Sequence, residues 1–168
     1  MMLTAADQEL LDLLLRLQEM QAGRRPEGWA YSSIHDFLIQ HATFFTPCGL
    51  PRTLRPMTLQ MCFENAYRVA RRTTAYHYVE GWAVRHIPVQ HAWVVDREGN
   101  AYDPTWASGS DLTVGTTYFG VELSLDEVAL SRRSGNHAVL DDWKRDYPAL
   151  QGRDVMAMER WHKGLNEK

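Results

Sequence analysis

At 168 residues, the chain has the length of one compact domain with a core of its own. Its hydrophobic content of 45% and its charged content of 23% are typical of a globular protein. The formal net charge of −3 is not the strongly basic balance that nucleic-acid binding favours, so no nucleic-acid partner is expected. Arginine pairs occur at 24–25, 71–72 and 132–133. Because they are scattered along the sequence, we interpret them as solvated helix ends.

Two further features concern redox chemistry and membranes. The chain has two cysteines, Cys48 and Cys62, and no Cys-x-x-Cys pair, so neither a disulfide framework nor a structural zinc site is expected. The leucine-rich N-terminal segment is interrupted by charged residues and has no basic region before it. It is predicted to be an amphipathic helix rather than a signal peptide or a membrane span. We therefore expect a cytoplasmic protein without a membrane partner.

The first part of the chain is predicted to be helical. A capping pattern at residues 4–7 opens a first helix, and Gly23 is its expected end. The same pattern at residues 33–36 predicts a short helix through His41. Residues 46–57 contain three prolines and a glycine and are predicted to form a loop.

Beyond this loop, Thr58 is the predicted N-cap of a helix that runs to about Arg72. The composition then changes to aromatic and β-branched residues, which favour strands. Strands are predicted at 76–84, 89–96, 100–105 and 116–123. Further helices are predicted after a cap at 124–127, and at 136–147 and 153–165.

Together these elements predict an α+β fold in a single domain that spans residues 1–168. The expected core is residues 58–124, in which the helix that carries Cys62 packs on a small antiparallel sheet. Residues 1–45 and 125–168 are expected to supply flanking helices.

Cys62 is the first residue with a chemical interpretation. It falls in the first turn of the predicted helix, where the peptide dipoles and the unpaired N–H groups favour a thiolate. It also shares a helix face with Ala66 and Val69, so a buried and inert cysteine fits the same pattern. Both interpretations stay open on this residue alone. Cys48 lacks the helix setting and is interpreted as structural.

His91 and Asp103 are brought together by the predicted hairpin. His91 shares the inward face of its strand with Trp93. If residues 97–99 form a three-residue turn with Gly99 left-handed, Trp93 pairs with Asp103, and His91 becomes a diagonal neighbour of Asp103 on one face. A two-residue turn would place them on opposite faces. A core histidine and a turn-forming Asp-Pro pair are the alternative interpretations.

These three residues carry a resemblance. A cysteine opening a helix, then HAWV on a strand, then DPTW after a hairpin resembles the transglutaminase-like branch of the papain-like cysteine enzymes. The segment YVEGWA resembles small bacterial and phage-type members. The resemblance covers residues 58–124 and implies a papain/transglutaminase-like core with Cys62 as nucleophile, His91 as base and Asp103 as the residue that orients the base. The short interval between Cys62 and His91 leaves little room for specificity loops.

Three more residues are candidates for oxyanion stabilisation or substrate binding. Gln60 would supply a side-chain amide to an oxyanion hole, beside the backbone N–H of the nucleophile, or would be an exposed first-turn residue. Glu80 would bind an amine or hydroxyl of the substrate, or would face solvent at a sheet edge. Trp93, like Trp82 and Trp106, would form a wall of the cleft or lie in the core.

The leading hypothesis is a cysteine hydrolase or acyltransferase that acts on an amide or related acyl bond in a peptide, a protein or a small amide. The reaction passes through a thioacyl enzyme and needs neither metal nor organic cofactor. A second hypothesis is a non-catalytic binding or inhibitor module that keeps the fold. A third, a metal hydrolase using His86, His91 and Asp103, needs a bulge at Pro88, because residues 86 and 91 otherwise project to opposite faces. The family includes hydrolases, transferases and inactive members, so it determines neither the substrate, the reaction nor the oligomeric state.

Overall fold

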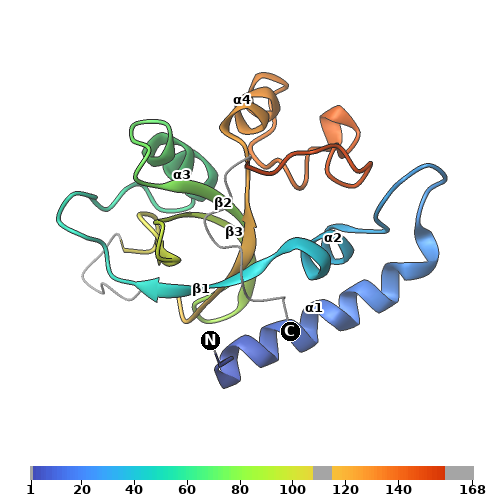
Figure 1. Cartoon of the computed structure of the whole chain (residues 1–168), viewed down its shortest axis with the longest axis horizontal. Helices are drawn as coiled ribbons and strands as arrows, with labels where there is room; N and C mark the ends of the chain where they lie inside the picture. Colours follow the sequence, from blue (N-terminus) through green and yellow to red (C-terminus); the bar gives the residue numbers. More distant parts are fainter. Residues whose placement is uncertain (1, 108–114, 158–168) are drawn as a thin grey trace.

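Over residues 2–107 and 115–157, which the computed structural model describes, four α-helices surround a closed barrel of five strands (Figure 1). The helices are α1 (Ala5–Gln21), α2 (Ile34–His41), α3 (Cys62–Ala70) and α4 (Leu125–Arg133). The strands are β1 (Thr43–Cys48), β2 (His77–Val84), β3 (Pro88–Val95), β4 (Asn100–Tyr102) and β5 (Thr117–Glu122). Their order is β1-β4-β3-β2-β5, and β5 pairs with β1 to close the barrel. The protein is therefore α+β, as predicted.

The first two helices begin where their capping residues predict. The Thr4 hydroxyl accepts a hydrogen bond from the Asp7 N–H at 3.1 Å, and the Asp7 carboxylate accepts one from the Thr4 N–H at 2.9 Å, which completes a capping box. The Ser33 hydroxyl caps α2 by accepting a single hydrogen bond from the N–H of Asp36. These starts are predictable because each depends on contacts within four residues.

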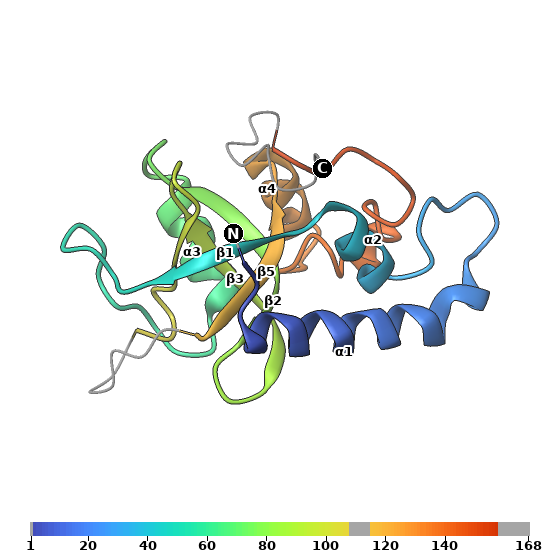
Figure 2. The ribbon, with the colours of Figure 1, turned by 60° about the horizontal axis from the view of Figure 1, so that its bottom comes forward.

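Two hydrophobic clusters hold the barrel and its helices together. One fills the barrel interior, where Trp93 and Val95 of β3 point inward. The other lies between the barrel and the helices and includes Ala92 and Val94 of the same strand. Because both faces of β3 are buried from His91 onward, its last four residues, 92–95, are continuously apolar rather than alternating. The helices α3 and α4 lie on one side of the barrel, while α1 and α2 pack near β5 on another (Figures 1 and 2).

The strand β1 corrects the predicted loop at 46–57. It pairs antiparallel with β5 and parallel with β4, placing Pro47 opposite Ala101. The sheet is therefore a closed barrel with one parallel pair rather than a small antiparallel sheet, and it extends beyond residues 58–124. A short strand that contains a proline has a weak local signal, and its partners lie more than fifty residues away in the chain.

The start of α3 also differs from the prediction. Its N-cap is Met61 rather than Thr58, and residues 59–60 form a turn before it. Gln60 in this turn has a φ of 63°, a left-handed conformation that is uncommon for a residue with a side chain. Cys62 consequently becomes the first residue of the helix itself.

The helix predicted at 136–147 is wrong. Its only regular element is a 3-10 turn, Trp143–Arg145. The N–H groups of Val139 and Leu140 donate to the buried carboxylate of Glu80 instead of to carbonyls four residues earlier. A non-local side chain has therefore replaced the helical hydrogen bonds of this segment.

The last predicted helix, 153–165, is not helical in its described part. Residues 153–157 are irregular, and Met156 forms an isolated antiparallel bridge with Leu123. Residues 158–165 lie outside the described residues. Among the helices that the structure describes, none has the length and apolar character needed to cross a bilayer.

At Gly81 the neighbouring strand of the barrel comes too close to leave room for a side chain. It pairs with His91 on one side and with Gly120 on the other, and a Cβ at position 81 would lie 2.1 Å from the carbonyl oxygen of Phe119. We expect Gly81→Ala to lower the free energy of unfolding by about 3 kcal/mol, because backbone atoms must move apart. Gly49→Ala is the control, since its Cβ meets nothing within 4 Å. It should change stability by less than about 1 kcal/mol in the same urea titration; equal effects would contradict the prediction.

Candidate active site

Cys62 lies at the N-terminus of α3. Here the first N–H groups have no acceptor within the helix, and no side chain in the described part of the chain caps this end. The helix dipole and these N–H groups favour negative charge, both on a sulfur atom and on an oxygen bound beside it. The cysteine is only partly buried, so this end of the helix is accessible.

The helix is held in place by its buried face and by one amide side chain. Ala66 and Val69 pack into the cluster between helix and barrel. Asn65, which is 2% exposed, donates from Nδ2 to the Thr58 carbonyl at 2.7 Å and to the Thr105 hydroxyl at 2.9 Å. The start of α3 is thereby fixed to the loop that follows β4.

The hairpin between β3 and β4 confirms the predicted register. Gly99 is left-handed, with a φ of 83°, and Val95 pairs with Ala101. Continued by two residues, this register sets Trp93 opposite Asp103. His91 Nε2 lies 2.7 Å from Asp103 Oδ2, and both side chains are buried.

The Asp103 carboxylate has four donors. Oδ1 accepts from the N–H groups of Thr105 at 2.9 Å and Trp106 at 3.0 Å, whereas Oδ2 accepts from His91 and from the Tyr118 hydroxyl at 3.1 Å. Pro104 has no N–H, so the next two residues supply the backbone donors. The Asp103 carboxylate is therefore fully paired and fixed in orientation, as the buried partner of an imidazole must be.

Tyr118 is a site residue that the sequence analysis did not identify. Its hydroxyl donates to Asp103 and accepts from the N–H of Gly115 at 2.9 Å. Burial first, and the charge of Asp103 second, raise the pKa of Tyr118, so the hydroxyl remains a donor. Because successive side chains of a strand point to opposite faces, the sequence of β5 could place the Tyr118 side chain inside a barrel. Only closure of that barrel brings the Tyr118 hydroxyl to Asp103.

His91 is hydrogen-bonded to Asp103, and its protonation is also influenced by Cys62. Burial alone would lower the pKa of this imidazole, but hydrogen bonds and charges from Asp103 and Cys62 outweigh burial and raise the pKa from 6.5 to about 9. Because Nε2 faces Asp103, Nδ1 is the nitrogen available to the thiol. An imidazolium between a carboxylate and a cysteine sulfur at a helix N-terminus is the arrangement that supports a thiolate.

Aromatic rings fix the plane of the imidazole. The Trp106 ring stacks on His91 with centroids 4.0 Å apart and planes within 14°. The Trp93 ring is also nearly parallel, at 6.5 Å, but its side chain is wholly buried inside the barrel. Trp93 thus supports His91 from the core, and of these two tryptophans only Trp106 is partly exposed. Trp82 is partly buried beside His35.

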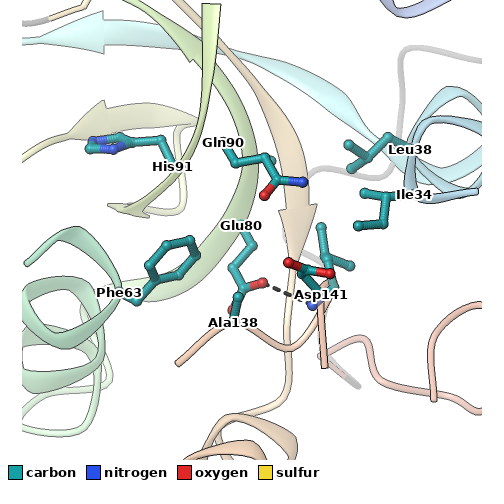
Figure 3. A pocket seen from close by; sticks show the side chains of 10 residues that line it. Ile34, Leu38, Phe63, Glu80, Gln90, His91, Ala138 and Asp141 are labelled. Atoms are coloured by element: carbon teal, nitrogen blue, oxygen red, sulfur yellow. Dashed lines mark hydrogen bonds between the residues drawn. The ribbon is translucent and has the colours of Figure 1, made fainter. Parts of the chain in front are cut away.

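Glu80 lies in the wall of a pocket next to His91 (Figure 3). The pocket is lined by Ile34, Leu38, Phe63, Glu80, Gly81, Gln90, His91, Ala138, Leu140 and Asp141. Glu80 is 1% exposed. Its carboxylate accepts hydrogen bonds from the Tyr78 hydroxyl at 2.7 Å and from the backbone N–H groups of Val139 and Leu140. Burial raises its pKa to about 7, against the effect of these bonds. The expectation of a solvent-facing Glu80 is wrong; the side chain holds one wall of the pocket.

Two other candidates lie on the surface. Gln60 is exposed in the left-handed turn two residues before Cys62, a position from which its amide remains a candidate oxyanion donor. His86 is exposed in the β2–β3 connection at 85–87, apart from the buried His91–Asp103 pair. Within 2–107 and 115–157, no group of three or more His, Cys, Asp or Glu side chains has the arrangement of a metal site.

Comparison with protein-family models, with curated proteins and with solved structures finds no match to this chain.

The role of Tyr118 can be separated from simple packing. We expect Tyr118→Phe to raise the pKa of His91, because Asp103 loses a donor that disperses its charge. The same change should lower the free energy of unfolding by about 2 kcal/mol, since the Gly115 N–H loses its acceptor. Imidazole NMR titration and urea unfolding measure the two effects.

The matched control is Tyr102→Phe. It removes a similar bond, from the Tyr102 hydroxyl to Asp96 at 2.8 Å, away from the imidazole. The titration of His91 should then be unchanged. If neither variant alters that titration, Tyr118 has only a packing role.

Proposed function

We propose that this protein is a cysteine-dependent hydrolase or acyltransferase that acts on an amide or related acyl bond through a Cys62–His91–Asp103 triad. The observation that carries the proposal is the 2.7 Å contact between His91 Nε2 and the buried Asp103 carboxylate, on an imidazole whose pKa is also raised by the Cys62 thiol at the N-terminus of α3. A histidine with a purely structural role has no need of a thiol partner at a helix N-terminus.

In the proposed reaction, the Cys62 thiolate attacks the carbonyl carbon and a tetrahedral oxyanion forms. The Cys62 N–H at the start of α3 stabilises this oxyanion, and the Gln60 amide is the second proposed donor. The carbon–nitrogen bond then breaks while His91 gives its proton to the leaving amine. Water or an acceptor amine attacks the resulting thioester, His91 takes up the proton, and the thiolate leaves.

The proposal extends to the core of the fold and to the substrate class. A helix that begins at Cys62 and packs on β2 and on β3, the strand that carries His91, is consistent with a papain/transglutaminase-like core. The closed barrel is an addition to that expectation. Peptides, proteins and small amides are the proposed substrates, and the reaction needs no metal or organic cofactor.

Selective alkylation tests the nucleophile. At neutral pH we expect iodoacetamide to label Cys62 more than about tenfold faster than Cys48, measured by peptide mass spectrometry. Burial and the charge of Asp96 raise the pKa of the Cys48 thiol, so it reacts slowly until the solution is alkaline. Below pH about 9, His91 is protonated and supports the Cys62 thiolate. Above this pH the support is lost, so the ratio of the Cys62 labelling rate to the Cys48 labelling rate should fall.

His91→Ala should slow the labelling of Cys62, and His86→Ala, which changes an exposed histidine, should not. Slow and equal labelling of both cysteines in the unmodified protein would sink the proposed chemistry. The non-catalytic binding module would then be the better account.

A further inference from the structure

Two arginine pairs that are distant in the sequence meet on the surface. The helices α3 and α4 lie side by side (Figure 1), and a groove of about 470 Å³ runs between them. This α3–α4 groove is lined by Glu64, Tyr67, Arg68, Arg71, Ala129, Arg132 and Arg133. Arg71, from the pair at 71–72, thus lies in one groove with the pair at 132–133, a proximity that the interpretation as scattered helix ends did not predict.

The groove is separate from the proposed active site. Tyr67, Arg68 and Arg71 lie on the face of α3 that is opposite its buried face, where Ala66 and Val69 pack on the barrel. A ligand in the groove therefore contacts neither the cysteine nor the pocket beside His91.

The arginines of the groove are positioned by their neighbours. The Glu64 carboxylate is ion-paired with Arg132 and lies 3.7 Å from the Nε of Arg68. Two guanidinium groups lie over the Tyr67 ring. The Cζ atom of Arg132 is 4.8 Å from the ring centroid, and the Cζ atom of Arg71 is 5.9 Å from it. Aromatic contacts and ion pairs of this kind reduce the freedom that guanidinium groups would lose on binding a ligand.

The local charge is opposite to that of the whole chain. Four arginines and one glutamate line the groove, which gives a net charge of +3 in a chain whose net charge is −3. The Arg68 side chain is 52% exposed, and Arg71 and Arg133 are also exposed. The Glu64 carboxylate is paired with two guanidinium groups, those of Arg68 and Arg132, so a carboxylate already lies among the arginines of the groove.

We propose that the α3–α4 groove binds a short acidic segment, rich in Asp and Glu, of a partner protein. Each helix has nine residues and is about 13 Å long, which matches about four residues of extended chain. A long nucleic acid fits less well, because it would extend beyond a groove of this length and would meet a chain whose overall net charge is −3.

The proposal is tested with the full chain and a fluorescently labelled glutamate hexapeptide. Fluorescence anisotropy should detect binding at low salt that weakens markedly at about 0.3 M salt. The double variant Arg71→Glu/Arg133→Glu should bind the peptide at least about tenfold more weakly. Glu64→Gln should tighten binding by about threefold, since it releases two guanidinium groups, whereas Glu98→Gln in the exposed hairpin turn should not.

The matched control is Arg24→Glu/Arg25→Glu, which makes the same change in net charge at an exposed arginine pair outside the groove. It should bind the peptide like the unmodified protein, and circular dichroism should show both double variants folded. Equal losses in the two double variants would overturn the proposal, as would no binding at low salt. Tighter binding of a single-stranded oligonucleotide of equal charge would overturn it in favour of nucleic acid.

Discussion

The buried carboxylate of Asp103 is the constraint on which the site depends. A charge with no exposure to water is tolerated only when hydrogen bonds satisfy it, and Asp103 receives donors from β3, from β5 and from its own loop. These donors can converge only if the barrel is closed and the hairpin is in register. The same bonds that stabilise the carboxylate also set the orientation of His91. Fold stability and site geometry are therefore coupled through one side chain.

A second buried carboxylate, that of Glu80, fixes one wall of the pocket beside His91. Glu80 on β2 binds the backbone of the irregular segment after α4, so a segment without a regular ladder still has its N–H groups satisfied. Asp103 and Glu80 differ in their donors. Each carboxylate accepts from a tyrosine hydroxyl and from two backbone N–H groups, but Asp103 is also paired with an imidazole, whereas Glu80 has no such partner in the described part of the chain and has a pKa raised to about 7. The first carboxylate orients the His91 imidazole, and the second supports a wall of the pocket.

The helix α3 serves three purposes in nine residues. Its N-terminus presents Cys62 to the imidazole, its buried face anchors it to the barrel, and its outer face contributes Arg68 and Arg71 to the groove with α4. The buried and outer faces are distinct because successive side chains are rotated by about 100° around the helix axis. A change on the outer face is thus expected to leave Cys62 in place.

What the sequence determined by itself was local. The helix starts at Thr4 and Ser33 depend on capping within four residues, and the meeting of His91 with Asp103 depends on a three-residue turn closed by Gly99. Only the tertiary structure decided the features that join distant segments. These are the strand β1, the closure of the barrel, the bond from Tyr118 to Asp103, the role of Glu80, and the meeting of the arginine pairs. Turn and cap geometry is encoded in adjacent residues, whereas pairing across more than fifty residues depends on packing that no local pattern specifies.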